Sequence, residues 1–106
     1  MIHNDEATLV TLTAVDSQVT RTEKTLFCGR KSVRYGEFYA AVQVGLKPQY
    51  VFEFDVDEFE SACVITGTAP NAVKHWPTEL IYEGCKYNII RTYEPPDGMI
   101  EVTVGL

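Results

Sequence analysis

Short segments in which apolar and polar residues alternate recur along this chain, and turn-forming residues separate them. The clearest segment is residues 50–57, where Phe52, Phe54 and Val56 alternate with acidic residues. Successive side chains of a strand point to opposite faces, so a two-residue period predicts a half-buried strand. The same period occurs at residues 8–15, 85–93 and 99–104. The chain is therefore expected to be mainly β.

The first of these segments is rich in threonine. Apolar Val10, Leu12 and Ala14 alternate there with Thr11 and Thr13. β-branched residues suit a pleated strand, and the alternation is that of a half-buried strand.

Three clusters of turn residues divide the strands. Asp-Ser-Gln at residues 16–18 predicts a turn, after which residues 19–33 resume extended character. Glu-Gly at residues 83–84 predicts a two-residue hairpin turn between residues 80–82 and the strand that follows. Glu-Pro-Pro-Asp-Gly at residues 94–98 predicts a reversal, because proline cannot donate to a strand ladder.

The period changes in the middle of the chain. Phe38, Ala41, Val42 and Gly45 fall at helical spacing, and a proline follows Gly45 by three residues. Such a glycine and proline end helices. The sequence therefore predicts one short α-helix at about residues 36–45.

Five to six strands with one short helix predict a small antiparallel β-barrel or rolled sheet. The 106 residues are expected to form a single domain, residues 1–106, that buries its own core. Residues 60–78 form a long atypical loop segment in this reading, with a short strand at 63–66 and a loop at 67–71. Loops of such length in a compact chain are often functional.

The charge is negative and unevenly placed. The formal net charge is -6, with 9 bases against 15 acids, which argues against binding nucleic acid or an anionic membrane through an extended basic surface. Bases gather in the first half, at Arg21, Lys24, Arg30, Lys31 and Arg34, and acids gather at residues 53–60.

Two arrangements of these charges are open. If the basic and acidic stretches are neighbouring strands, the charges compensate across the sheet. If they lie at opposite ends, head-to-tail self-assembly becomes natural. For the acids themselves, the solvated face of a strand is favoured over a calcium site, because Glu53, Asp55 and Asp57 alternate with apolar residues.

Few residues indicate chemistry. The three cysteines, Cys28, Cys63 and Cys85, are widely spaced, so neither a disulfide scaffold nor a zinc module is expected. A nucleophilic pair of His75 with Cys63 or Cys85 is a remote alternative. Phosphate-binding loops and nucleophile elbows do not occur in the sequence. We expect no enzyme activity, no cofactor and no metal. The acidic N-terminus is not that of a secretory signal, so a soluble cytoplasmic protein is expected.

An ordered series of short motifs resembles one family. The motifs are Phe27-Cys28 before Ser32-Val33, Glu37-Phe38-Tyr39-Ala40-Ala41, Gly45-Leu46-Lys47-Pro48, Tyr50-Val51-Phe52, Tyr82-Glu83-Gly84 with Lys86-Tyr87, and Arg91-Thr92-Tyr93. Together they cover about half of the chain, and in their order they resemble the head closure proteins of long-tailed phages and prophages, also called head completion or head-tail joining proteins. Two features depart from the family pattern: Gly36 stands where many relatives have serine, and residues 60–78 replace a short acidic turn.

The resemblance implies a structural virion protein. Such proteins assemble as a ring beneath the portal and its adaptor protein, retain the packaged DNA and receive the tail, so the chain is expected in the host cytoplasm during assembly and then in the head-tail connector. DNA would be nearby without being specifically bound, and no membrane is involved. Before it meets a partner ring, the chain is expected to be a monomer.

The implied fold, a small β-barrel with a short helix between strands, suggests a division of the aromatic residues. Phe38, Val42, Leu46, Phe52 and Phe54 are predicted to fill the core. The residues predicted at protein interfaces are Arg34, Tyr35, Glu37, Tyr39, Lys47 and Tyr50, because tyrosine offers a large apolar area with a polar end. A host-type β-barrel adaptor that binds a peptide along a strand edge is the alternative function.

Overall fold

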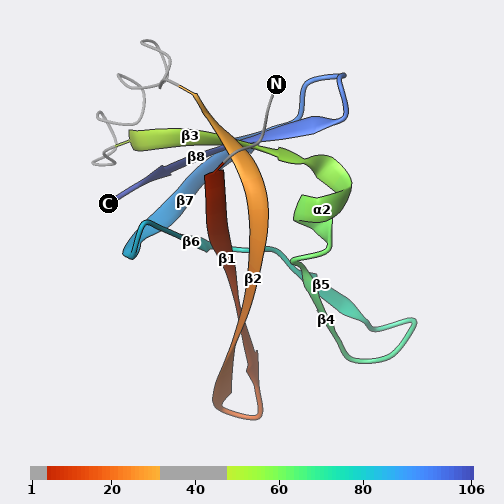
Figure 1. The fold of residues 1–106 in the computed structure, drawn as a ribbon. Helices are drawn as coiled ribbons and strands as arrows, with labels where there is room; N and C mark the ends of the chain where they lie inside the picture. Colours follow the sequence, from red (N-terminus) through yellow and green to blue (C-terminus); the bar gives the residue numbers. More distant parts are fainter. Residues whose placement is uncertain (1–4, 32–47) are drawn as a thin grey trace.

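Six antiparallel strands close into a barrel in the computed structural model, which describes residues 5–31 and 48–106 (Figure 1). In order around the barrel they are β1 (Asp5–Val15), β2 (Gln18–Lys31), β3 (Pro48–Asp55), β8 (Met99–Gly105), β7 (Cys85–Tyr93) and β6 (Glu79–Tyr82). The helix α2 (Val56–Glu60) and a separate two-stranded sheet of β4 (Val64–Thr66) and β5 (Val73–His75) lie to one side. The predicted antiparallel β-barrel is confirmed.

The predicted helix at residues 36–45 lies outside the described residues, as do Phe38, Val42 and Leu46 of the predicted core. The other two predicted core residues, Phe52 and Phe54, are fully buried, which confirms their assignment.

Two tight turns set the hairpin registers. Val15 pairs with Gln18 across the turn at residues 16–17, whose backbone φ angles are 51° and 68°. Tyr82 pairs with Cys85 across residues 83–84, with φ of 50° and 78°. Positive φ at both central residues matches the right-handed twist of the flanking strands. Both predicted turns are confirmed.

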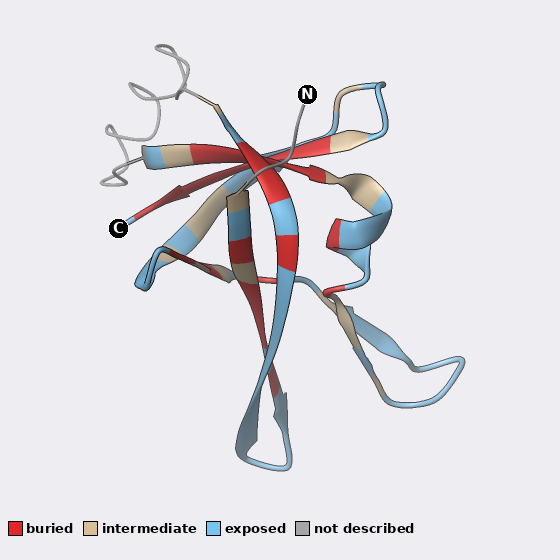
Figure 2. Ribbon diagram, viewed as in Figure 1, coloured by how far each residue is buried: buried red, intermediate tan, exposed pale blue. Residues whose placement is uncertain are grey.

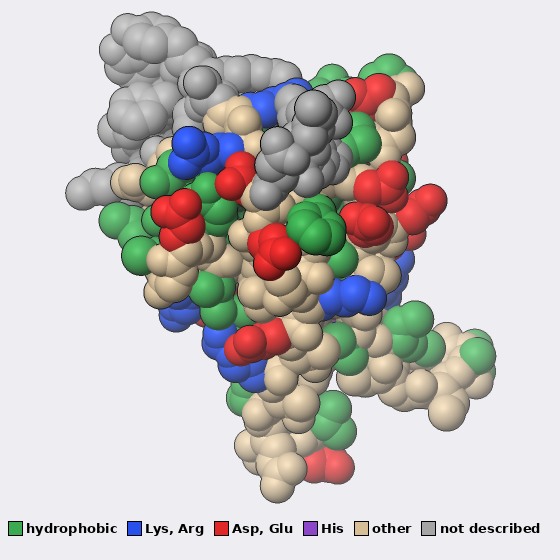
Figure 3. Space-filling model, viewed as in Figure 1, with side chains coloured by type: hydrophobic (Ala, Val, Ile, Leu, Met, Phe, Trp, Pro, Cys, Tyr) green, Lys and Arg blue, Asp and Glu red, His purple; other side chains and the backbone are tan. Residues whose placement is uncertain are grey.

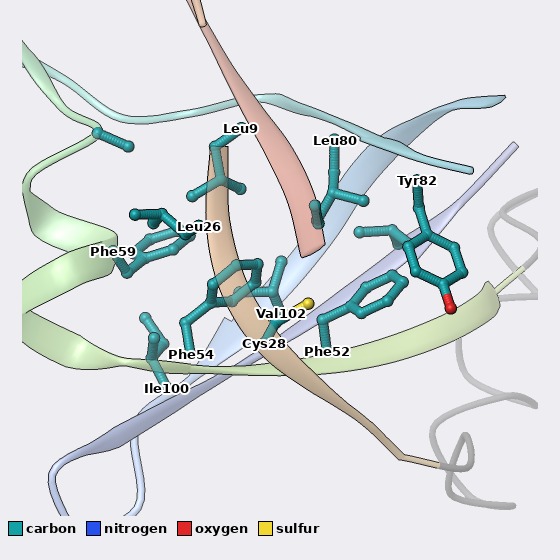
Figure 4. Packing of buried hydrophobic residues seen from close by; sticks show 13 residues of the cluster. Leu9, Leu26, Cys28, Phe52, Phe54, Phe59, Leu80, Tyr82, Ile100 and Val102 are labelled. Atoms are coloured by element: carbon teal, nitrogen blue, oxygen red, sulfur yellow. The ribbon is translucent and has the colours of Figure 1, made fainter. Parts of the chain in front are cut away.

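The barrel interior is filled by aromatic and aliphatic side chains from all six strands and α2 (Figure 4). The Phe52 ring contacts those of Tyr50 and Tyr82, at centroid distances of 5.7 and 4.8 Å. Phe54 contacts Phe59 of α2 at 5.8 Å. Aromatic pairs at these distances add to the stabilisation from burial. The core therefore continues from the barrel under the helix.

The strand predicted to run to residue 57 ends two residues earlier. The Asp55 carboxylate accepts hydrogen bonds from the backbone N–H groups of Asp57 and Glu58, at 3.0 and 3.3 Å. Asp55 is therefore the N-cap of α2. The carboxylates of Asp57 and Glu58 lie in the first turn, where the positive end of the helix dipole stabilises negative charge. The prediction of a strand through Val56 was wrong because the capping aspartate redirects the chain.

In β1, Thr11 and Thr13 are buried together with Val10, whereas the apolar Leu12 and Ala14 are exposed. Thr11 and Thr13 have exposed fractions of 0% and 6%, whereas Leu12 is 38% exposed. The Thr11 hydroxyl donates a hydrogen bond to the Ala62 carbonyl at 2.8 Å. Thr11 and Thr13 lie on the same face of β1 as Leu9, which points into the barrel. The segment that follows α2, including Ala62, covers this face.

Residues 60–78 contain more regular structure than a loop. The predicted strand at 63–66 corresponds to β4, and β5 pairs with it, Val64 opposite His75. Trp76 then stacks on Phe59, with ring centroids 6.2 Å apart and an interplanar angle of 26°. The stacking anchors this second hairpin to the core through α2.

Replacing Phe54 by alanine is expected to lower the free energy of unfolding by about 3–5 kcal/mol, because a fully buried ring leaves a cavity beside Phe59. Urea unfolding followed by circular dichroism measures it. Ile65→Ala, at a side chain that is 67% exposed, is the control and should change stability by less than about 0.5 kcal/mol. Equal effects of the two substitutions would contradict the core assignment.

Candidate interaction surfaces and the Lys31 ion-pair centre

Five of the six predicted interface residues, Arg34, Tyr35, Glu37, Tyr39 and Lys47, lie outside the described residues. Their role stays a prediction.

The sixth, Tyr50, is half-buried at one end of the barrel. Its ring packs edge-on against Tyr87 and Tyr82, with centroids 5.5 and 5.7 Å away, and the Arg30 guanidinium carbon lies 5.5 Å from its centroid. Cation–π contacts at such distances are attractive. Tyr50 therefore has a packing role, and any contact it makes with a partner would use only its exposed part.

Tyr82 fixes this aromatic cluster to the start of β1. Its hydroxyl donates a hydrogen bond to the Asp5 carboxylate at 3.1 Å. Burial, together with that hydrogen bond and the negative charge, raises the pKa of Tyr82 to about 12. The phenol is thus a neutral donor at physiological pH and suits a structural role.

An ion-pair centre joins three strands on the outer face of the barrel. Glu53 of β3 and Glu101 of β8 lie directly opposite each other, and both are nearly buried. The Lys31 ammonium of β2 lies 2.8 Å from the Glu53 carboxylate and 3.0 Å from that of Glu101. Directly opposed like charges destabilise a sheet, and the Lys31 ammonium offsets this repulsion between the two glutamates.

This centre decides between the two charge arrangements left open by the sequence. Gly29 of β2 pairs with Glu53 of β3, so part of the basic stretch and part of the acidic stretch are neighbouring strands, and Lys31 compensates Glu53 across them. The prediction that these acids form a solvated face was wrong for Glu53, which is 4% exposed. Alternation predicted its face correctly but could not show that this face is covered.

The thiols differ in environment. Cys28 is buried in the barrel, and burial raises its pKa to about 12. Burial also raises the pKa of Cys63, whereas Cys85 is exposed beside a hairpin turn. Nucleophilic cysteines have lowered pKa values. Cys28 and Cys63 therefore lack the environment that catalysis requires.

The remaining enzyme and metal alternatives gain no support from the geometry. The His75 ring lies 2.9 Å from the Thr66 hydroxyl, within the β4–β5 hairpin. Among residues 5–31 and 48–106, no three His, Cys, Asp or Glu side chains are placed to hold a metal ion.

Two hairpins expose apolar side chains and were not recognised as surfaces from the sequence. We call the distal part of the β1–β2 hairpin, residues 11–22, the arm; it extends beyond the barrel (Figures 1 and 2). It exposes Leu12, Val15 and Val19, and the β4–β5 hairpin exposes Ile65, Val73 and Trp76. Apolar side chains show on both hairpins in Figure 3. Exposed apolar groups near one another are typical of interaction surfaces.

Lys74 and Glu60 border the apolar side chains of the β4–β5 hairpin. The Lys74 ammonium lies 4.5 Å from the centroid of the Trp76 ring and 4.0 Å from the Glu60 carboxylate. The tryptophan, stacked on one side and covered by a cation on another, keeps 46% of its surface exposed. A large ring held in place in this way can contact a partner with little loss of side-chain entropy.

Comparison of the chain with protein-family models, with curated proteins and with solved structures gave no match. In the described part of the chain, the helix found is too short to cross a membrane.

Replacing Lys31 by methionine is expected to destabilise the protein by about 1–3 kcal/mol, because the opposed carboxylates of Glu53 and Glu101 lose their common cation while the aliphatic stem is kept. Chemical denaturation at pH 7 measures the effect. Lys86→Met is the matched control: this exposed lysine lies 3.3 Å from Glu79, and its loss should cost at most about 0.5 kcal/mol.

The Lys31 contribution should also depend on pH. The hydrogen bond to Glu53, and to a smaller extent the one to Glu101, raises the pKa of Lys31 above its ordinary value of 10.5. The folded state thus holds this proton more tightly, so the stabilisation is fully present below pH 10.5 and is lost as the pH rises through the folded-state pKa. The difference in stability between wild type and Lys31→Met should shrink above that pH. A constant difference would contradict the ion-pair origin.

Alkylation at pH 8 should separate the thiols. Iodoacetamide is expected to modify Cys85 first and to reach Cys28 only after unfolding, because Cys28 is buried and its raised pKa keeps it protonated. Peptide mass spectrometry after timed quenching reads the order. Rapid modification of Cys28 or Cys63 in the folded protein would revive the thiol-enzyme alternative.

Proposed function

We propose that this chain is a structural protein of long-tailed phages or prophages that closes the head after DNA packaging and forms the connection to the tail. Its partners are the portal-adaptor protein on one side and a tail or tail completion protein on the other, and the chain forms a ring between them. In this proposal it performs no reaction and needs no cofactor.

The observation that carries the proposal is the ordered series of motifs between Phe27 and Val104 on a chain that folds as a closed antiparallel barrel. The barrel is the architecture that the resemblance implies. It supports the proposal without being specific to it, since small barrels serve many functions.

Three further features support an assembly role. The arm and the β4–β5 hairpin present apolar side chains outside the barrel, as contacts with other subunits require. The described thiols with raised pKa values suit packing better than nucleophilic attack. The net charge of -6 disfavours tight binding to DNA, which a protein beside the exit channel must let pass.

The predicted contacts of this ring are those of Arg34, Tyr35, Glu37, Tyr39, Lys47 and Tyr50, with tyrosine rings as the main apolar anchors. The exposed hairpins are available for a different partner. Under this proposal a ring subunit can contact its neighbours and the tail through separate surfaces.

Mixing the purified protein with the portal-adaptor complex encoded beside its gene should give a co-sedimenting complex, with an additional ring of density in negative-stain images. Tyr35→Ala and Tyr39→Ala should each weaken this association, by about tenfold or more if these tyrosines are central anchors. Lys86→Ala, at an exposed lysine of the barrel wall, is the control and should assemble normally.

The proposal fails if the folded wild-type chain does not co-sediment with the portal-adaptor complex. It also fails for the two tyrosines if both variants lose folding as isolated domains yet still join tails. Binding of an extended peptide without any affinity for the complex would favour the peptide-binding adaptor instead.

A further inference from the structure

Within the part of the chain that the structure describes, the second side of β2 has no strand along most of its length. On one side, β2 pairs with β1 from Gln18 to Cys28 without interruption. On the other side, β3 takes up only Gly29, Arg30 and Lys31. Among the described residues, the open side of residues 18–28 thus has no strand partner, and residues 18–25 are exposed (Figure 2).

The hairpin turn determines which backbone groups face the open side. In a hairpin with a two-residue turn, the residues that flank the turn form a hydrogen-bonded pair, and such pairs alternate along the ladder. Gln18 flanks the turn, so the even-numbered residues of β2 bond to β1. Val19, Arg21, Glu23 and Thr25 therefore direct their N–H and C=O groups to the open side.

Some devices that usually protect a sheet edge are missing along this stretch, as far as the described residues show. Such devices are proline, a bulge, charged side chains or a covering element, and of these the stretch carries charged side chains, Arg21, Glu23 and Lys24. Residues 18–28 contain no proline, and their register with β1 has no shift. The charges that point outward from the barrel, Arg21 and Glu23, have opposite signs and lie 2.8 Å apart, and Arg21 also lies 3.3 Å from Glu79 of β6.

We propose that a second copy of this chain pairs with β2, antiparallel, about a two-fold axis through Thr22. In this register Arg21 of each copy lies directly opposite Glu23 of the other copy, which forms two equivalent ion pairs. An axis through Arg21 or through Glu23 would instead place like charges opposite each other, which is destabilising. Charge thus favours an axis through Thr22 over an axis through either charged residue, and it favours a second copy as the occupant because that copy carries both charges.

The hydrogen-bond phase agrees with that register. Arg21 opposite Glu23, and Val19 opposite Thr25, join residues whose backbone groups all face the open side. Thr22 meets Thr22 of the second copy in a non-hydrogen-bonded pair, where Cα atoms lie about 4.5 Å apart. The result is a four-stranded sheet with the order β1, β2, β2, β1.

The projection of the arm leaves space for this sheet. Because the arm extends beyond the barrel (Figure 1), two antiparallel arms can lie side by side with their barrels at opposite ends. A two-fold axis makes the contact closed, so it yields a dimer and no fibre. This dimer does not depend on the proposed virion function, and it revises the expectation of a monomer in solution.

A disulfide test reports the register. In a Cys85→Ser background, Thr22→Cys should form a covalent dimer on mild oxidation, because the two Cα atoms lie within disulfide range. Thr20→Cys is the matched control: it stands opposite Lys24 of the second copy and should crosslink little. Non-reducing gels and intact mass spectrometry read the product. A crosslink that is equal for both variants, or absent for Thr22→Cys, would overturn the proposal.

A charge-swap series tests the occupant. Arg21→Glu should raise the dimer dissociation constant by about tenfold or more, because two attractive pairs become repulsive. The double variant Arg21→Glu with Glu23→Arg should return it close to the wild-type value. Sedimentation velocity over a range of concentrations measures all three, with circular dichroism to establish folding. A wild-type chain that stays monomeric at every concentration, or no recovery in the double variant, would overturn the self-pairing.

Discussion

Closure of this barrel depends on a short seam between β2 and β3. Within the described residues three residue pairs join the two strands, as few as join β1 to β6, whereas β1 and β2 pair over eleven and β3 and β8 over seven. Lys31 lies at that seam and holds the opposed carboxylates of Glu53 and Glu101. The described backbone pairing at this seam is short, so the ion pairs of Lys31 add to the connection between β2 and the β3–β8 sheet.

The same short seam leaves β2 available for other contacts. Since β3 pairs with the last residues of β2, the remaining edge has no strand partner among residues 5–31 and 48–106, and the arm extends beyond the barrel wall. The apolar residues of the arm and of the β4–β5 hairpin lie outside the closed core. A barrel with two exposed hairpins offers surfaces for contacts with other subunits, which is the role proposed above for this chain.

Local signals in the sequence were enough for much of the fold. The turns at residues 16–18 and 83–84, the alternation around Phe52 and Phe54, and the proline-rich reversal before the last strand all depend on neighbouring residues, and all correspond to observed elements. Errors arose where a single residue had two readings. Asp55 fits a strand face and also a helix N-cap, and only the hydrogen bonds to Asp57 and Glu58 show that it serves as the cap.

Candidate surfaces were harder to predict than strands. The threonine face of β1 is covered by the segment around Ala62, fifty-one residues away from Thr11. The Ala62 carbonyl accepts a hydrogen bond from the Thr11 hydroxyl. The burial of Glu53 and its contact with Lys31 likewise join segments far apart in the chain. A periodic pattern shows which side chains share a face, but not which face another part of the chain covers.

By itself, the sequence determined that this protein is an antiparallel β structure with turns at defined places, because period and turn chemistry act between neighbouring residues. Only the tertiary structure decided that Glu53 is an ion-pair partner, that Thr11 is buried and that, in the described part of the chain, the edge of β2 has no strand partner. These properties depend on which strands meet when the barrel closes, and pairing between distant segments has no local signature.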